Sequence, residues 1–267
     1  MDNMLIVGEK INTGRPGIEG AIISRNVALI QDLALRQKLS GADVLDLNCT
    51  TMRHREPEGL SWLVETVQTV VNEPVCLDSP NPVALEAALK VHRGRAFINA
   101  ISAEETRYRT LIPLVKQYRC KVIALCLDDQ GVPETVDQEI AVANRLMERL
   151  TQDGVDVDDV YLDPLIRPVG QGEHWGNFSL EVIRRLRGEF PAMHIICGVS
   201  NISYSLPARA LLNRTFLTLA ISAGLDGAIL DPENKNLMAS LRAAEALLQK
   251  DPGFRRYVLA FREGQLT

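Results

Sequence analysis

Two kinds of sequence segment alternate along the chain. Short apolar runs rich in β-branched residues recur at intervals, and longer segments with helically spaced apolar residues separate them. Eight such runs occur, at residues 4–7, 44–47, 74–77, 96–98, 122–127, 160–162, 194–197 and 227–230. Near-continuous apolar runs of this kind are typical of strands buried on both faces, so each run predicts a strand of a parallel sheet.

The intervening segments predict helices. The clearest apolar stripe follows the i, i+3, i+4, i+7 spacing of one helix face and consists of Leu60, Leu63, Val64, Val67, Val70 and Val71. Similar stripes occupy residues 83–91, 140–150 and 237–248. Asn81 followed by Pro82 predicts a helix start, because asparagine caps the first turn and proline fits its first position.

Eight strand–helix units predict a closed (β/α)8 TIM barrel with a parallel eight-stranded sheet. The mean unit is about 33 residues long, a plausible βα size in a chain of 267 residues. An open doubly wound sheet is the structural alternative. No linker or low-complexity stretch interrupts the pattern, so we expect one domain over residues 1–267, with residues 250–267 as a C-terminal tail that could hold a short helix.

Composition narrows the function classes. Apolar residues make up 46% and charged residues 24%, with a net charge of -5, as in ordinary soluble globular proteins. The absence of a basic cluster argues against nucleic-acid binding. The longest apolar run has about six residues, whereas a membrane span needs about 20. No signal peptide is expected from the start Met1-Asp2-Asn3, and five cysteines without a C-x-x-C motif suit a reducing cytoplasm.

The residues that follow the predicted strands are the candidate chemistry, because barrel active sites lie at the carboxyl ends of the strands. Acids and amides dominate these positions, which are Glu9, Asp46, Asn48, Asp78, Asn99, Asp128, Asp163, Ser200, Asn201 and Asp231. None of the strand ends, defined in this way, carries Lys, Arg, His or Cys. Any one of these residues could simply cap the following helix, but the full ring converges on one mouth.

This ring predicts a neutral, flat heterocycle as ligand. Carboxylates accept hydrogen bonds and amides both donate and accept, so a guanidine-like edge would pair with one carboxylate through two hydrogen bonds. A phosphate-centred ligand is disfavoured because no Walker or dinucleotide glycine pattern is present. The four histidines are scattered, so no protein-bound metal is expected. Cys49 and Cys126 lie near strand ends, where packing is the expected role.

Several short motifs together resemble those of a known protein family. They are Gly8-Glu9-Lys10-Ile11-Asn12, Asp46-Leu47-Asn48, Leu77-Asp78-Ser79, Ile98-Asn99, Leu162-Asp163-Pro164-Leu165, Gly198-Val199-Ser200-Asn201 and Leu212-Asn213-Arg214-Thr215-Phe216. In this order and spacing the chain resembles the pterin-binding methyltransferases, most closely those that act on methyltetrahydrofolate and a corrinoid (iron–sulfur) protein. The match extends over nearly the whole chain.

The resemblance implies a homodimeric (β/α)8 barrel that moves a methyl group between N5 of tetrahydrofolate or 5-methyltetrahydrofolate and the cobalt of a corrinoid (cobalamin). The acids that match Asp78 and Asp163 hold the pterin edge in the family, and the amide that matches Asn99 supports it. The position of Asn201 contacts the N5 region. The remaining matching positions, together with Glu9 of the strand-end ring, complete the expected folate site: Asp46, Asn48, Gly198, Ser200 and Arg209.

Asn201 is the expected catalytic residue. Methyl transfer from a tertiary amine needs positive charge on that nitrogen, and an amide can accept a hydrogen bond from protonated N5 without holding the proton too strongly. The chain lacks the D-x-H-x-x-G signature of a corrinoid-carrying domain, so the corrinoid is expected on a partner protein.

Two departures and two alternatives stay open. Cys49-Thr50 replaces a small apolar residue and glycine after Asn48, and the loop at residues 167–177 is particular to this chain, so the identity of the corrinoid partner does not follow. The alternative functions are dihydropteroate synthase, which needs basic residues for pyrophosphate, and a folate-binding barrel without catalysis. The physiological direction of methyl transfer is also open.

Overall fold

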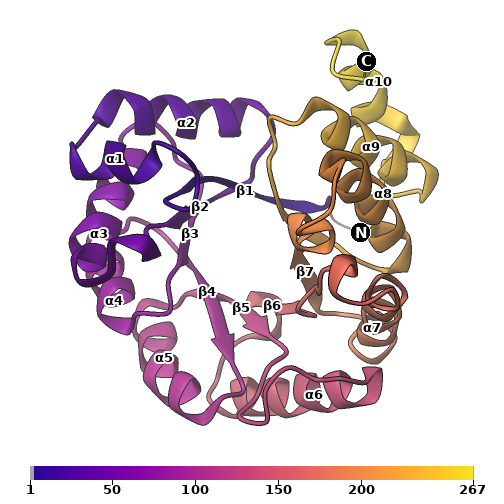
Figure 1. The fold of residues 1–267 in the computed structure, drawn as a ribbon, viewed down its shortest axis with the longest axis horizontal. Helices are drawn as coiled ribbons and strands as arrows, with labels where there is room; N and C mark the ends of the chain where they lie inside the picture. The colour runs from indigo at the N-terminus through magenta and orange to yellow at the C-terminus, as the bar shows by residue number, and fades with distance from the viewer. Residues whose placement is uncertain (1–2, 267) are drawn as a thin grey trace.

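The computed structural model describes residues 3–266, and its centre is a closed barrel of parallel strands (Figure 1). The strands follow one another in chain order, and β1 closes the ring by pairing in parallel with β8. This arrangement confirms the predicted (β/α)8 barrel and excludes the open doubly wound sheet. The strands are β1 (Leu5–Asn12), β2 (Val44–Asn48), β3 (Val75–Asp78), β4 (Phe97–Ser102), β5 (Lys121–Leu125), β6 (Val160–Asp163), β7 (His194–Gly198) and β8 (Gly227–Leu230).

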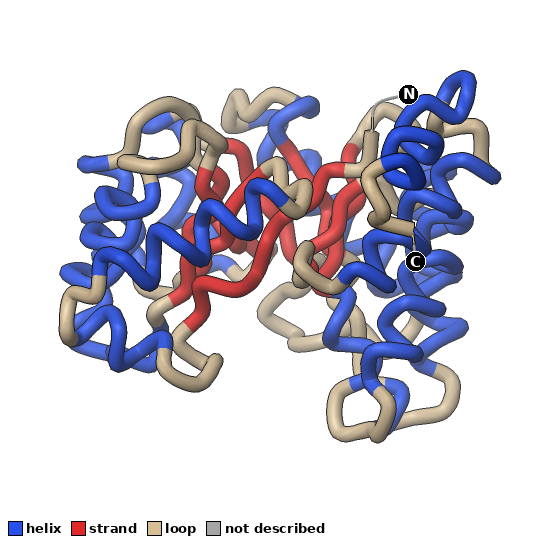
Figure 2. The backbone as a smooth tube through the Cα atoms, turned by 90° about the horizontal axis from the view of Figure 1, so that it is seen from above, coloured by secondary structure: helices blue, strands red, loops and turns tan. Residues whose placement is uncertain are grey.

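Helices surround the strands on the outside, as the view from above shows (Figure 2). The α-helices are α1 (Ile18–Ile23), α2 (Val27–Leu39), α3 (Glu56–Val67), α4 (Pro82–Val91), α5 (Glu105–Tyr118), α6 (Val136–Gln152), α7 (Trp175–Glu189), α8 (Arg209–Ala223), α9 (Lys235–Leu247) and α10 (Arg255–Arg262). Short 3-10 turns lie in the connections: η1 (Thr50–Arg55), η2 (Val157–Asp159), η3 (Val169–Gln171), η4 (Val199–Ser203) and η5 (Pro252–Phe254).

Every predicted apolar run overlaps one strand, but the strand ends differ from the runs. β1 continues to Asn12, five residues beyond the predicted end, and β4 continues to Ser102. Polar residues near the mouth interrupt the apolar pattern, although the backbone there continues to form the hydrogen bonds of the sheet. The apolar runs therefore end before the strands do. The predicted cap of α4 is confirmed, because the Asn81 side chain accepts a hydrogen bond from the Val83 amide at 3.0 Å and Pro82 opens the helix.

A bulge in β1 explains its unexpected length. The pairing of β1 with β2 shifts register between Gly8 and Ile11, which leaves the Lys10 amide without a ladder partner. Gln37, fully buried on α2, supplies that partner by accepting from the Lys10 amide at 2.9 Å. A side chain at Gly8 would collide with this amide group, since its Cβ would lie 2.6 Å from Gln37 Oε1. Glycine therefore permits the bulge.

Two apolar cores hold the barrel together. The larger one lies between the strands and the surrounding helices, and its members include Ile6, Leu45 and Leu77 of the strands with Leu60 and Leu63 of α3. The smaller one fills the inside of the barrel with side chains from successive strands: Val7, Val44, Cys76, Phe97, Ala100, Ile123, Tyr161, Ile196 and Ile229. The barrel interior is thus a packed core below the mouth, as expected for this fold.

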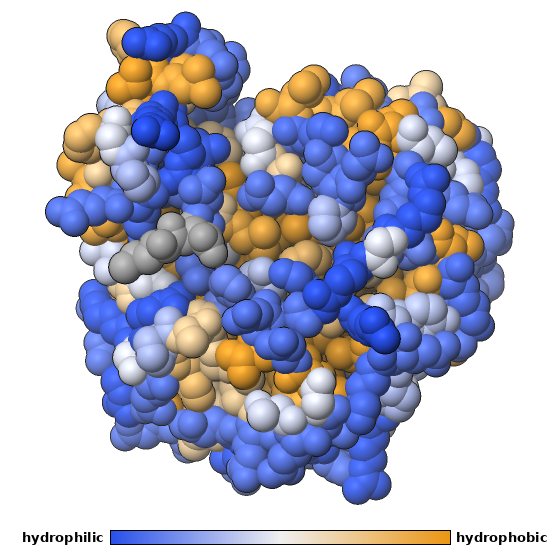
Figure 3. All heavy atoms as spheres, turned by 180° about the vertical axis from the view of Figure 1, so that it is seen from behind, coloured by the Kyte–Doolittle hydropathy of each residue, from blue (hydrophilic) through white to orange (hydrophobic). Residues whose placement is uncertain are grey.

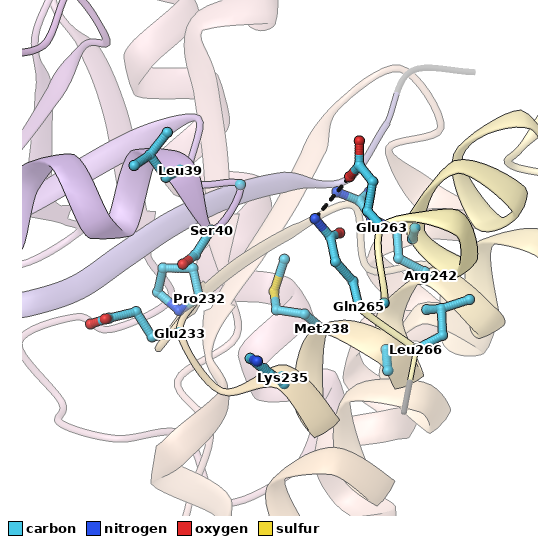
Figure 4. A pocket seen from close by; sticks show the side chains of 14 residues that line it. Leu39, Ser40, Pro232, Glu233, Lys235, Met238, Arg242, Glu263, Gln265 and Leu266 are labelled. Carbon is cyan, nitrogen blue, oxygen red and sulfur yellow. Dashed lines mark hydrogen bonds between the residues drawn. The ribbon is translucent and has the colours of Figure 1, made fainter.

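The predicted C-terminal tail contains α10, which projects beside α9 (Figure 1). A pocket of about 390 Å³ lies outside the strand ring where the end of α2, the start of α9 and residues 260–266 meet. Figure 4 shows its polar wall, where Gln265 donates a hydrogen bond to Glu263 at 2.9 Å. No helix within residues 3–266 is both long and apolar enough to cross a membrane.

Candidate active site

The site arises from the alternation of side chains along each strand. Residues two positions apart point to the same side, so the residue two beyond an interior core residue also points inward, but at the mouth. The interior residues are Val7, Val44, Cys76, Phe97, Tyr161, Ile196 and Ile229. The residues two positions later are Glu9, Asp46, Asp78, Asn99, Asp163, Gly198 and Asp231, and Asn48 follows Asp46 by the same step. The structure therefore brings these members of the predicted ring together at one mouth.

Asn48 and Asp78 form the tightest contact in the ring. The Asn48 amide donates to Asp78 Oδ2 at 2.7 Å across the β2–β3 ladder. The oxygen of the Asn48 side-chain amide accepts from the Thr50 backbone amide at 3.1 Å and from the Thr50 hydroxyl at 2.9 Å. Thr50 therefore fixes which end of the Asn48 amide faces Asp78. The Cys49-Thr50 departure thus orients the amide, while Cys49 itself is fully buried and packs.

Asp46 and Asn99 form a weaker pair deeper in the mouth. The Asn99 amide donates to Asp46 Oδ1 at 3.4 Å, and Asp46 is only 2% exposed. Burial and then the neighbouring Asp78 raise the pKa of Asp46 well above its usual range. A protonated Asp46 can donate a hydrogen bond, so this position can offer either a donor or an acceptor to a ligand.

Asp78 keeps its charge more readily than its depth suggests. Burial raises its pKa, while the Asn48 hydrogen bond and the Arg107 guanidinium lower it and Glu56 raises it. Glu56 is buried and accepts from the Ser79 hydroxyl at 2.6 Å, which ties the residue after Asp78 to the start of α3. The pKa of Asp78 is therefore raised overall, but the Asn48 hydrogen bond and the Arg107 charge support its carboxylate form.

Asp163 has few polar partners. Its Oδ1 accepts from the Leu165 backbone amide at 2.9 Å, and burial raises its pKa to about 7. Behind it lies Glu139 of α6, which is only 1% exposed. Burial and then the charge of Asp163 raise the pKa of Glu139 to about 9. A neutral acid thus stands next to an acid whose protonation changes near neutral pH.

The β1 side of the mouth corrects one expectation. Because β1 continues past the bulge, Lys10 lies in the strand and its ammonium group reaches Asp231 at 3.5 Å and Glu233 at 2.6 Å. The strand ends are therefore not free of basic residues. Glu9 pairs with Arg15 at 2.9 Å, and burial, opposed by Arg15, raises the Glu9 pKa to about 7.

The turn η4 carries Ser200 and Asn201, and the predicted residues Gly198 and Arg209 lie at the end of β7 and the start of α8. Arg209 donates to the Ser200 carbonyl at 2.8 Å and to the Ser203 hydroxyl at 3.1 Å, so it fixes the turn. Asn201 is exposed, and no hydrogen bond of its side chain is found within residues 3–266. Gly198 makes room for this amide, since a Cβ there would lie 3.1 Å from Asn201 Nδ2.

Asp128 is the one strand-end acid that the structure uses elsewhere. β5 ends at Leu125, and Asp128 forms a short bridge with Gly131 and an ion pair with Arg145 of α6. It therefore stabilises a turn and not the mouth.

Cys126 is fully buried, which confirms its packing role. In the loop at residues 167–177, Arg167 stacks on Trp175 with 3.9 Å between the guanidinium carbon and the ring centroid.

The sequence analysis did not predict the roles of Thr50, Arg107 and Glu139. Thr50 stands out in the sequence only as part of the Cys49-Thr50 departure, and the contacts of Thr50 and Arg107 depend on the folded backbone. Glu139 did carry a signal, because it precedes Ala143 by four and Leu146 by seven residues and so shares the apolar face of α6. A carboxyl group on an apolar stripe marks a buried titratable residue.

The donor and acceptor set fits the predicted ligand edge. Asp78 at the end of β3 and Asp163 at the end of β6 provide acceptors, Asn48 orients Asp78, and the Asn99 and Asn201 amides can donate or accept. Such a set matches a pterin, whose amino group and ring N–H donate and whose ring nitrogens and carbonyl accept. Within residues 3–266, no group of three or more His, Cys, Asp or Glu residues is arranged to hold a metal ion.

The fold and this set of residues define a pterin-binding barrel, and comparison with known proteins agrees. Residues 13–231 match the family described as "Pterin binding enzyme", and the chain belongs to this family. It is 33% identical over 266 residues to the methylcorrinoid:tetrahydrofolate methyltransferase of Eubacterium limosum, which covers 98% of both chains. It is also 32% identical over 240 residues to methionine synthase of Mycobacterium leprae, which covers 85% of this chain but 20% of that protein.

Solved structures of dihydropteroate synthases share the fold. The Yersinia pestis enzyme with a pterine-sulfa conjugate superimposes with a TM-score of 0.71 and 12% identity, covering 93% of this chain and 94% of that chain. The Coxiella burnetii enzyme in complex with pteroic acid gives a TM-score of 0.67 and 14% identity, covering 92% and 95%. At these identities the likeness concerns the barrel alone.

Proposed function

We propose that the protein is a methyltransferase that moves a methyl group between N5 of tetrahydrofolate and the cobalt of a corrinoid that a partner protein carries. The observation that carries this proposal is the convergence of Asp46, Asn48, Asp78, Asn99 and Asp163 at one barrel mouth. The family and the name of the Eubacterium limosum relative support it. That name places tetrahydrofolate as the methyl acceptor, and we propose the same direction here.

The polar ring would hold the pterin edge. Asp78 and Asp163 accept from the pterin N–H groups, Asn99 and Asn48 complete the hydrogen bonds, and Asp46 lies beneath them. Glu9, Gly198, Ser200 and Arg209 shape the rest of the folate site. Charge-assisted hydrogen bonds in a buried site contribute about 1.5–3 kcal/mol each, which is enough to orient the ring system.

Asn201 would assist the change of charge at N5. In the forward direction the N5 electron pair forms the new bond to the methyl carbon, the electron pair of the broken carbon–cobalt bond stays on cobalt as Co(I), and N5 then loses its proton. Asn201 accepts from this N5–H while N5 is positively charged, and the reverse reaction uses the same contact. A preorganised polar group of this kind contributes about 2–4 kcal/mol to the transition state.

Anaerobic spectroscopy tests the proposal directly. Free cob(I)alamin mixed with 5-methyltetrahydrofolate should lose its cob(I) absorption at catalytic concentrations of the protein, because the transfer is reversible. An unchanged cob(I) spectrum despite tight folate binding would instead support a folate-binding barrel without catalysis. If neither binding nor turnover occurs, the methyltransferase proposal fails.

Dihydropteroate synthase remains the enzymatic alternative because of the shared barrel. Its product pyrophosphate needs free basic groups at the mouth. Lys10 is paired with Asp231 and Glu233, and Arg209 binds the Ser200 carbonyl, so both charges are already engaged. Release of pyrophosphate from a dihydropterin pyrophosphate and p-aminobenzoate would favour this alternative.

We also propose a homodimer, a cytoplasmic location and a single domain over residues 1–267. Five free, buried cysteines suit a reducing compartment. Figure 3 shows apolar side chains on the projecting C-terminal segment, where Phe254 of η5 and Leu259 and Phe261 of α10 are 57%, 53% and 71% exposed. Light scattering after size exclusion would test the dimer, and a monomeric mass would reject it.

A further inference from the structure

Arg107 joins the two strand ends that carry Asp78 and Asn99. It lies in the first turn of α5, beside the mouth. Its Nε donates to the Ala100 carbonyl at 2.7 Å, and its Nη2 donates to the Ser79 carbonyl at 3.4 Å. Ala100 directly follows Asn99, and Ser79 directly follows Asp78. One guanidinium therefore contacts the backbone immediately beyond both residues.

The surrounding contacts make this junction rigid. The Ser79 backbone amide donates to the Asn99 carbonyl at 3.2 Å, which continues the β3–β4 ladder past the last residue of β3. The Ser79 hydroxyl donates to Glu56 at 2.6 Å and accepts from the Asn81 amide at 2.9 Å. Arg107 is half-buried here, so its hydrogen bonds are partly shielded from water.

A neighbour on the same helix shows that this placement is specific. Arg109 lies two residues further along α5, its side chain is 78% exposed, and it pairs with Glu105 one turn earlier. The two arginines share a helix and a charge, but only Arg107 reaches the strand ends. Arg109 is therefore a matched control for any effect of removing a positive charge from α5.

We propose that Arg107 is a positioning residue of the pterin site, which fixes the spacing of Asp78 and Asn99 by binding the Ser79 and Ala100 carbonyls. This inference rests on the proposed function, because it assigns Arg107 to the same folate site. Two carbonyls of different strands need two donors in a fixed geometry, which a planar guanidinium provides and an ammonium group does not.

Arg107 has a second effect on the same site through its charge. The groups that bear on Asp78 are Arg107, Glu56, Asp46 and the Asn48 amide. Of these, Arg107 is the positively charged one, and it lowers the pKa of Asp78 against burial and Glu56. Without this charge, Asp78 should become protonated at a higher pH. As the pH is lowered, it should therefore stop accepting hydrogen bonds from the ligand sooner than in the wild type.

The test compares three variants, Arg107→Met, Arg107→Lys and Arg109→Met, by calorimetric titration with 5-methyltetrahydrofolate between pH 5 and 8. We expect Arg107→Met to raise the Kd about 10-fold or more and to shift the acid-side midpoint of binding upward by about 0.5–1 pH unit. Arg107→Lys should keep the wild-type midpoint but still bind several-fold more weakly. Arg109→Met should match the wild type in both respects.

The outcomes separate the two proposals. If the wild type does not bind 5-methyltetrahydrofolate, the proposed function fails, whatever the variants do. If the wild type binds and both Arg107 variants match its Kd and its pH midpoint, the positioning role is overturned. Thermal unfolding of each variant shows which ones are folded. Should Arg107→Met not fold, Arg107→Lys decides, because wild-type affinity in that variant contradicts a need for two donors.

Discussion

The β2–β4 sector and the β6–β7 sector of the mouth differ in how firmly their polar side chains are held. In the first sector, Asn48 binds Asp78, Asn99 binds Asp46, and Thr50 orients Asn48. In the second sector, Asp163 accepts one backbone hydrogen bond, and no side-chain partner of Asn201 is found in the described part of the chain. One sector is preorganised, and the other can change its protonation and orientation.

This difference matches the two tasks that the proposed reaction sets. A pterin edge keeps its hydrogen-bonding pattern throughout methyl transfer, so a rigid set of acceptors can bind it without loss during the reaction. N5 changes its charge, so the groups near it must respond. The first sector would therefore serve binding alone, whereas the second would combine binding by Asp163 with the chemistry at N5. Five substitutions test this difference.

The largest effect is expected for Asn201→Ala in the responsive sector. Loss of the acceptor for N5–H should lower kcat/KM about 100-fold or more while the fold survives. Steady-state kinetics with 5-methyltetrahydrofolate and cob(I)alamin measures this, and thermal unfolding checks the fold. Asn177→Ala, on an exposed position of α7, is the control. Unchanged turnover in Asn201→Ala would remove the catalytic role of this amide.

Charge-neutral substitutions at the two acids come next. Asp78→Asn and Asp163→Asn should each weaken folate binding by about 1–3 kcal/mol, which is about 5–150-fold in Kd, because buried N–H groups lose a charged partner. They should differ in pH dependence. The wild-type pKa of Asp163 is about 7, so Asp163→Asn should flatten the rise in folate affinity through neutral pH, to which Glu9 also contributes, whereas Asp78→Asn should retain this rise. Equal pH profiles in both variants would contradict the distinction between the sectors.

Sequence predicted the fold well, together with the place of most strand-end polar residues. Eight apolar runs correspond to eight strands in order, and the strand-end acids and amides other than Asp128 lie together because side chains alternate with a two-residue period along each strand. The bulge in β1 that places Lys10 at the mouth was not predictable, because it depends on a hydrogen bond to Gln37 of helix α2. Arg107 was not predictable either, since its partners are backbone carbonyls of two strands.

Glu139→Gln tests the apolar surroundings of Asp163. The pKa of Glu139 is 4.5 when unperturbed and about 9 in the folded protein. Between these values the unfolded chain loses the proton and the folded chain keeps it, so the free energy of unfolding falls as pH rises. Glutamine removes this cost and should stabilise the protein by about 2 kcal/mol near pH 8, with little change near pH 4.5.

Urea unfolding at pH 5 and pH 8 measures the effect of Glu139→Gln. Glu148→Gln, an exposed position on the same helix, should change stability by less than about 0.5 kcal/mol at either pH. Equal stability of Glu139→Gln and wild type at pH 8 would mean that Glu139 is not held as a neutral acid behind Asp163.

The smallest effect is expected for Arg209→Ala, which loosens η4 without removing a ring member. Arg209 is exposed and binds the Ser200 carbonyl and the Ser203 hydroxyl, so its loss should lower kcat about three- to tenfold through a less well placed Asn201. Arg184→Ala, an exposed arginine of α7 paired only with Glu181 among the described residues, should leave kcat unchanged. A wild-type kcat in Arg209→Ala would show that the turn holds its shape without this contact.

The most direct test of the division between binding and chemistry is a single-turnover experiment with Asp78→Asn and Asn201→Ala side by side. The rate of cob(I)alamin methylation is followed anaerobically as the 5-methyltetrahydrofolate concentration is raised to saturation. We expect Asp78→Asn to reach nearly the wild-type rate but to need far more folate. We expect Asn201→Ala to saturate at nearly the wild-type folate concentration with a rate about 100-fold lower. If both variants lose affinity and saturated rate in the same proportion, the two sectors do not have separate tasks.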